Sequence, residues 1–171
     1  MQITNMSSLP TDVTLTTYGV PETAPDAGGY GYRITREYFD MQGNAVTDLS
    51  LTVGDRLVTV LTVLPLESGE SRLMVNDPLP AGLEIDNPNL IRSGDIRGLD
   101  WLQTANTEHE EFLSDRFLAA VNWRKAEPFR LAYIVRATLP GSYHHPAASV
   151  EDMYRPQYRA RGATGAMTVT E

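Results

Sequence analysis

The stretch of the sequence richest in reactive side chains is SVEDMYRPQYRARGATG, residues 149–165. It contains two acids, a methionine, two tyrosines and three arginines, with proline and glycine marking turns. Such a set can form a catalytic site, a binding surface or a solvated edge. Composition alone leaves these three interpretations open.

Two adjacent histidines, His144 and His145, lie just before this stretch and close to Glu151 and Asp152. A metal site is conceivable because imidazole and carboxylate both bind zinc. Neighbouring residues on an extended chain, however, point to opposite faces, so both histidines are not expected to reach one ion. The third histidine, His109, lies in the acidic segment EHEE. We therefore expect solvated loop histidines, with no metal site and no cofactor.

The sequence contains no pattern of a catalytic nucleophile. It has no cysteine, no G-x-S-x-G and no S-x-x-K. None of its 22 acids stands out as a pair for glycoside hydrolysis. Glycine-rich phosphate loops are also missing, because GGYGYR lacks the strand–helix context that such a loop needs. We expect a protein that is not an enzyme.

Charge and hydropathy restrict the partners. With a net charge of −8, the chain would be repelled by a phosphate backbone, so nucleic acid is not expected. No run of 18 apolar residues occurs, so no direct membrane contact by this domain is expected. The first ten residues have neither a basic start nor an apolar core, so the export signal of a secreted parent would lie elsewhere.

The elements that must position these side chains have the pattern of short strands. RLVTVLTVLP is apolar on both faces, which is typical of a central strand in a sandwich. RFLAAVNW and FRLAYIVRATLPG are predicted to pair, and DVTLTTYGV alternates like a half-buried strand. TEHEEFLSDR could carry one helical turn started by Thr107. ATGAMTVTE is predicted as the terminal strand.

Turn signals occur about every ten residues, so we predict an all-β fold. Its form would be an antiparallel β-sandwich of seven to nine strands with at most a short helix. Residues 1–28 are interpreted as a leading strand and linker, and residues 29–171 as the domain. In NDPLPAGLEIDNPNL, Pro78 and Pro80 fix an extended path, after which Leu83 and Ile85 return to the core.

Three segments in this order resemble a known family: NDPLPAGLEIDNPNL, SDRFLAAVNW and the block from LAYIVRATLPG to the glycine of RARGATG. Together they resemble the C-terminal macroglobulin-like domain of bacterial alpha-2-macroglobulins. The likeness runs from YRITREYFD to the end. Its most specific part is P-G-x(4)-P-A-x-x-V-E-D-M-Y-R-P, and TDVTLTTYGVPETAP is similar to the segment leading into that domain.

The resemblance implies a non-catalytic role in a protease trap. These proteins are large periplasmic lipoproteins, whose N-terminal lipid would anchor the parent to the inner membrane. A target protease cuts a bait segment, the molecule rearranges, and the protease is enclosed. In members with a cysteine–glutamine thioester, the C-terminal domain packs on the thioester domain and shields that bond until the bait is cut. The partners implied are therefore the thioester domain, other macroglobulin domains and target proteases.

The same resemblance assigns residues. The Met-Tyr pair that makes this interdomain contact corresponds to Met153 and Tyr154. Glu151, Asp152, Arg155 and Pro156 would support the loop. A flexible methionine and a large tyrosine ring with one hydroxyl suit the covering of a bond that water would hydrolyse.

Several alternatives stay open at this point. Met153 and Tyr154 could instead pack within their own domain. Because the chain has no cysteine, the thioester would lie in another domain, and a parent without one would make this an interaction module acting with other envelope proteins. A carbohydrate-binding sandwich would need an exposed aromatic platform, with Trp101 or Trp123 as candidates.

Overall fold

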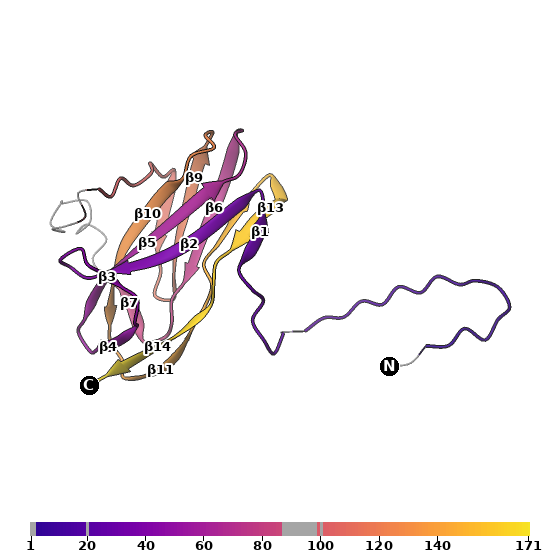
Figure 1. Ribbon diagram of the computed structural model, residues 1–171, viewed down its shortest axis with the longest axis horizontal. Helices are drawn as coiled ribbons and strands as arrows, with labels where there is room; N and C mark the ends of the chain where they lie inside the picture. Colours follow the sequence, from indigo (N-terminus) through magenta and orange to yellow (C-terminus); the bar gives the residue numbers. More distant parts are fainter. Residues whose placement is uncertain (1–2, 20, 87–98, 100) are drawn as a thin grey trace.

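The computed structural model describes residues 3–19, 21–86, 99 and 101–171. These residues form fourteen strands in three sheets, and no helix occurs among them (Figure 1). The predicted all-β sandwich is confirmed. The strand count exceeds seven to nine because six strands have only two to four residues, too few to show an alternating pattern.

The two larger sheets form the layers of the sandwich. The six-stranded sheet has the order β1 (Gly28–Tyr30), β13 (Arg155–Arg161), β12 (Ser149–Asp152), β6 (Ser71–Pro78), β9 (Arg116–Trp123) and β8 (His109–Phe112). The five-stranded sheet has the order β3 (Ala45–Val46), β2 (Tyr32–Phe39), β5 (Arg56–Pro65), β10 (Phe129–Ala137) and β7 (Leu83–Ile85).

A third sheet closes one end of the molecule, near the C-terminus (Figure 1). Its order is β11 (Gly141–His145), β14 (Gly165–Thr170) and β4 (Ser50–Thr52). The terminal strand is thus confirmed as β14. Its pairing with β4 is parallel, whereas every other described pairing is antiparallel.

Strand β5 is central and buried on both faces, as its composition predicts. Leu57, Leu61 and Val63 join the main core between the two larger sheets. Val58 and Val60 face the other way, into a small second cluster that contains Leu99 and Ile134. A strand covered on both sides has no solvent face, which explains why RLVTVLTVLP lacks polar alternation.

Strands β9 and β10 do not pair with each other, so that prediction is wrong. Strand β9 pairs with β6 and β8, and β10 pairs with β5 and β7 in the opposite sheet. They meet face to face instead: the rings of Phe117 and Tyr133 stack with centroids 4.6 Å apart, and Trp123 and Phe129 approach to 4.8 Å. Adjacency in sequence suggested a hairpin, whereas burial of these rings favours the two faces of a sandwich.

Two further local predictions are wrong. The described part of DVTLTTYGV, Asp12–Gly19, is not a strand: its side chains are exposed and it has no sheet partner within the described residues. TEHEEFLSDR forms β8 rather than a helical turn, because Glu110 and Phe112 align with Ala119 and Phe117 of β9. The local preference of the acidic residues for a helix start is weaker than the stabilisation gained when this segment pairs with β9 at the edge of the sheet.

The proline-marked segment behaves as predicted where it is described. Strand β6 ends at Pro78, the backbone turns at Ala81–Gly82, and Leu83 re-enters the core at the start of β7. Its last four residues, 87–90, lie outside the described residues.

The stacked pair at the centre of the core gives a stability prediction. Phe117→Ala should lower the free energy of unfolding by about 3–5 kcal/mol, because it removes a buried ring and leaves a cavity against Tyr133. Urea unfolding followed by tryptophan fluorescence measures the change. Phe112→Ala is the matched control, since Phe112 is only partly buried at the sheet edge. Equal losses in the two variants would contradict this account of the core.

Candidate interaction site

The loop singled out by the sequence is the tip of a hairpin between β12 and β13. Met153 and Tyr154 form its two-residue turn, and the two residues are 48% and 73% exposed. Both side chains therefore point away from the core of this domain. The interpretation that they pack within their own domain is excluded by these exposures.

The turn is held by the side chain of Asp152, which is buried at the base of the tip. One carboxylate oxygen accepts hydrogen bonds from the Arg155 Nε at 2.9 Å and Nη2 at 2.7 Å. The other accepts the Tyr154 backbone N–H at 3.0 Å. The hydrogen bonds to Asp152, together with the negative charge of that carboxylate, raise the pKa of the Arg155 guanidinium above its ordinary value. A carboxylate bound from both sides of a turn fixes the backbone direction there.

Neighbouring strands add further attachments to the tip. The Met153 N–H donates to the Arg72 carbonyl of β6 at 2.8 Å, and the Arg72 guanidinium lies 5.7 Å from the centre of the Tyr154 ring. Arg155 also donates to the carbonyl of Glu70 at 3.2 Å. Glu151 and Pro156 are exposed on the two strands that flank the turn. The ordered support thus comes from Asp152, Arg155 and Arg72.

Sequence reasoning missed an aromatic extension of this tip. Tyr158 packs against Tyr30 at 4.9 Å, and the Arg155 guanidinium lies 4.7 Å from the centre of the Tyr158 ring. Tyr158 lies over Gly31, whose φ is 78° and whose missing Cβ would meet the ring at 2.3 Å. Only glycine fits there. Tyr30, Gly31 and Tyr158 can be read in the sequence, but the contact between them depends on the pairing of β1 with β13, which the sequence does not reveal.

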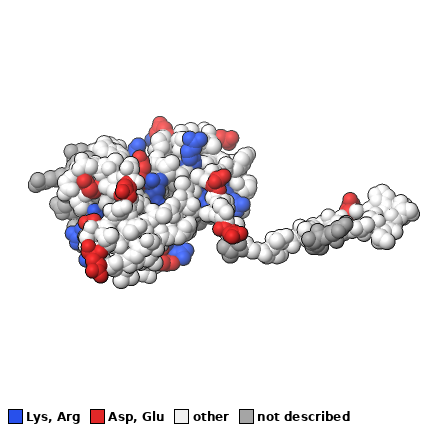
Figure 2. Space-filling view, turned by 60° about the horizontal axis from the view of Figure 1, so that its bottom comes forward, with Lys and Arg blue, Asp and Glu red and all other residues white. Residues whose placement is uncertain are grey.

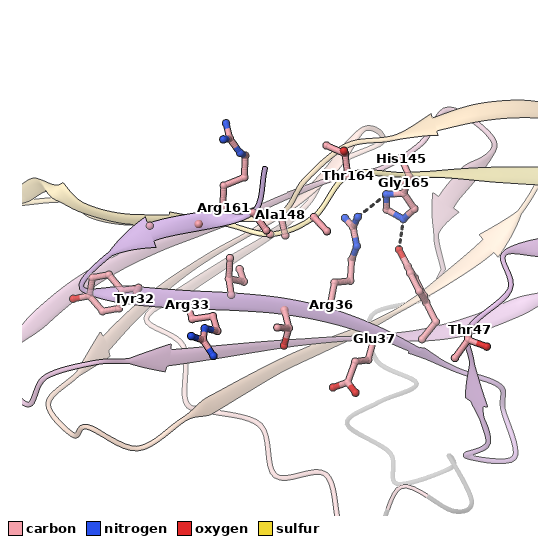
Figure 3. Close-up of a pocket in the computed structure, with 18 of the residues that line it drawn as sticks. Tyr32, Arg33, Arg36, Glu37, Thr47, His145, Ala148, Arg161, Thr164 and Gly165 are labelled. Atoms are coloured by element: carbon pink, nitrogen blue, oxygen red, sulfur yellow. Dashed lines mark hydrogen bonds between the residues drawn. The ribbon is translucent and has the colours of Figure 1, made fainter. Parts of the chain in front are cut away.

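A buried polar cluster joins the three sheets. Asp77, fully buried on β6, accepts hydrogen bonds from Arg36 of β2 at 2.5 Å and from the Tyr133 hydroxyl of β10 at 2.6 Å. Arg36 also donates to His145 Nδ1 at 2.6 Å, and His145 Nε2 bonds the Tyr38 hydroxyl (Figure 3). A guanidinium can only donate, so Nδ1 accepts and Nε2 carries the imidazole proton.

Burial governs the titration of this cluster. It lowers the pKa of His145 to about 4, and the positive charge of Arg36 acts in the same direction. Burial also raises the pKa of Asp77, while Arg36 and the Tyr133 hydroxyl oppose that shift by bonding the ionised form. The pKa of Tyr38 is raised by burial as well. These groups are placed to tie strands together, and they lie beneath the surface.

The histidines are arranged differently from the prediction in one respect. His144 is exposed and His145 is buried, so they do point to opposite faces, but His145 is not a solvated loop residue. His109 and Glu111 are both exposed on β8, with the His109 Nε2 2.9 Å from a Glu111 carboxylate oxygen. Within the described part of the chain, no three histidine, cysteine or acidic side chains gather in a way that could hold a metal ion.

The two tryptophans named as candidates for an aromatic platform differ in exposure, since Trp101 is exposed and Trp123 is partly buried. Trp123 packs on Phe129 and donates its indole N–H to the Glu127 carbonyl at 3.1 Å. Trp101 is 47% exposed and packs between Phe39 and Arg130 at 5.5 Å from each. On the face shown in Figure 2, acidic and basic side chains are intermixed, with no continuous basic tract. Among the described residues no helix is long and apolar enough to cross a bilayer.

The fold and the tip define an all-β sandwich domain, and comparison with known proteins identifies its type. The family model described as the bacterial alpha-2-macroglobulin MG10 domain matches residues 31–157. The alpha-2-macroglobulin of Escherichia coli K12 is 36% identical over 95% of this chain, and that of Xylella fastidiosa 9a5c is 34% identical over 89%. In each case the match covers 10% of the relative, so the chain spans about a tenth of the length of these curated relatives.

Solved structures agree. Native E. coli alpha-2-macroglobulin from domain MG7 to the C-terminus matches with a TM-score of 0.80 and 36% identity, over 90% of this chain and 25% of that one. The trypsin-activated E. coli protein gives 0.77 and 35%, over 90% and 11%. Salmonella alpha-2-macroglobulin reacted with methylamine gives 0.78 and 34%, over 90% and 10%. The chain therefore belongs to the bacterial alpha-2-macroglobulin family, as an MG10 domain.

The buried imidazole predicts a pH dependence of stability. Because the His145 pKa falls from 6.5 to about 4 on folding, the unfolded chain binds more protons between these values. The free energy of unfolding should thus decrease as the pH falls from about 6.5 to about 4, by about 3 kcal/mol at most from this group.

Urea unfolding at several pH values tests this against His145→Gln, whose amide can accept from Arg36 and donate to Tyr38. The difference between wild type and variant removes the common contribution of the carboxylates. Parallel pH profiles for the two proteins would show that His145 is not the group responsible.

Proposed function

We propose that this chain is the C-terminal, non-catalytic latch domain of a bacterial alpha-2-macroglobulin. In this role its Met153–Tyr154 tip covers the thioester in a neighbouring domain of the parent chain and separates from it when a protease cuts the bait. The observation that carries the proposal is the tip itself: two large side chains, mostly exposed, on a turn fixed by the Asp152 carboxylate.

The physical requirement is exclusion of water and amines from a reactive bond. Exposure of the apolar surface of Met153 and Tyr154 to water is unfavourable, and docking against a thioester pocket would remove that surface from solvent. Met153 supplies a side chain that adapts to an irregular surface, and Tyr154 supplies area and one hydrogen-bonding hydroxyl. Because Arg72 and Arg155 hold the turn before contact, little conformational entropy remains to be lost on docking.

The related structures support the setting of this proposal. One relative was studied in its native state and after activation by trypsin, and another after reaction with methylamine. A protease and a small amine are the two reagents expected to act on a bait segment and on a thioester, respectively. By this analogy we propose that the parent is a protease trap. Its periplasmic location and N-terminal lipid anchor in the inner membrane are proposed from the family resemblance alone.

The second candidate is an interaction module of a parent without a thioester. The same rigid tip would then be a docking surface that shields no bond, and other envelope proteins would be its partners. A Cys-x-x-Gln motif in the remainder of the parent favours the latch, and its absence favours the module.

Tyr154→Gly in the parent protein tests the shielding role. Removal of the ring should open the thioester to small amines, so incorporation of radiolabelled methylamine in the native state should rise several-fold in rate. Leu139→Gly is the control, since Leu139 is also a large exposed apolar residue but lies on another turn, between β10 and β11. Labelling at the wild-type rate, in a parent shown to contain the thioester, would refute the role of Tyr154.

A further inference from the structure

Strand β2 leaves one backbone edge unpaired along much of its length. It pairs with β5 on one side, but on the other side, among the described residues, only Tyr38 and Phe39 pair, with β3. The Leu66 N–H donates a hydrogen bond to the Gly31 carbonyl. Gly31 and Leu66 are therefore a hydrogen-bonded pair, and so is every second residue pair after them along β2 and β5. Arg33, Thr35 and Glu37 therefore direct their backbone groups to β5. Tyr32, Ile34 and Arg36 direct theirs to the open edge.

This edge faces a trough of about 750 Å³ (Figure 3). The trough is bordered by the residues before β1, by the β3 region and by the connection from β13 to β14, with Ala148, Gly162 and Thr164 among its lining. Within the described residues, neither Ile34 nor Arg36 has a backbone hydrogen-bond partner on this side. The volume of the trough lies in the range of about 300–1,000 Å³ that is usual for ligand clefts.

Open strand edges are normally protected, and among the described residues this one is protected only in part, by Gly162 near the Ile34 carbonyl and by the inward-pointing Arg36. Natural proteins shorten, bulge, charge with lysine or cover such edges, because unpaired N–H and C=O groups recruit other strands. Strand β2 has eight residues, without proline or lysine, and its register with β5 is uninterrupted. An unpaired edge beside a trough is the arrangement used to accept an added strand.

The charges at the trough select the kind of segment. Arg33 and Arg161 line it with Glu37, and Arg36 is already bound to Asp77 and His145. Arg161 donates one bond to the Asp26 carbonyl, while its Nε is buried with no partner among the described residues. The available charge is therefore positive, in a chain whose net charge is −8. A carboxylate on the incoming segment would match it.

We propose that the open edge of β2 accepts an extended segment from another domain of the parent chain, which adds to the five-stranded sheet as an extra strand. Its backbone would bond Ile34 and Arg36, and a carboxylate on it would approach either Arg33 or Arg161, which point to opposite sides of the trough (Figure 3). This proposal rests on the proposed function only in that the chain is one domain of a longer parent. It is independent of what the tip at Met153 and Tyr154 covers.

Hydrogen exchange at single amides, measured by mass spectrometry with electron-transfer fragmentation, tests the proposal in the isolated chain and in the parent. In the isolated chain, the amides of Ile34 and Arg36 should exchange fast and those of Arg33, Thr35 and Glu37 slowly. In the parent, Ile34 and Arg36 should slow by about tenfold or more, because their N–H groups become bonded. The alternation along one strand is an internal control.

Ala163→Trp in the parent should reverse the slowing, because Ala163 is an exposed residue that lines the trough and an indole would fill it. Ala166→Trp is the matched control, since Ala166 is exposed on β14 and does not line the trough.

Three outcomes would overturn the proposal. Fast exchange of Ile34 and Arg36 in the parent would show that nothing covers the edge. Slow exchange in the isolated chain that depends on concentration would assign the edge to a second copy. Slow exchange there that is lost on deletion of residues 1–20 would assign it to the chain's own arm. Methylamine labelling reads the tip and not this edge, so failure of the latch leaves this measurement unaffected.

Discussion

The fold depends on one buried carboxylate. Asp77 belongs to β6 in the six-stranded sheet, and its two donors, Arg36 and Tyr133, belong to β2 and β10 in the five-stranded sheet. Through His145, Arg36 extends the network to β11 in the third sheet. An apolar interior would be satisfied by many relative placements of two layers, whereas a buried charge has to meet its donors. Loss of Arg36 would leave that buried charge without its counter-ion, which costs several kcal/mol.

This constraint extends to the tip. Arg36, Tyr133 and Asp77 set the position of β6 along the sandwich, and the Arg72 carbonyl of that same strand receives the Met153 N–H. The hairpin of β12 and β13 is therefore positioned from the core outward. Its own pair, Asp152 with Arg155, then fixes the turn. If the tip meets another domain in one geometry, as proposed, it needs such support, because exposed side chains alone lose entropy when they are ordered.

The sequence predicts the features that depend on local pattern. The two apolar faces of β5, the terminal strand and the return of the chain after Pro80 are local, and the structure confirms them. Pairing is not local. The strand pattern of Asp12–Gly19 has no sheet partner within the described residues, and β9 and β10 face each other across the core because each has better partners elsewhere. For the same reason the site was predicted only in part: EDMYRP identified the turn, but Arg72, Tyr30 and Tyr158 reach it by pairings between distant segments.

A latch has to hold and later separate, which limits how its contacts can be built. The Met153–Tyr154 tip and the neighbouring Tyr30 offer few large exposed side chains, so a contact through them alone would be small, as in transient interfaces between domains. The open edge of β2 would add a second contact, made mainly of backbone hydrogen bonds and one charge pair. Within a single chain two weak contacts reinforce each other through effective concentration, because formation of one holds the other near. The same coupling would make release cooperative. A rearrangement that removes either proposed contact would lower the effective concentration for the other, so both would be lost together.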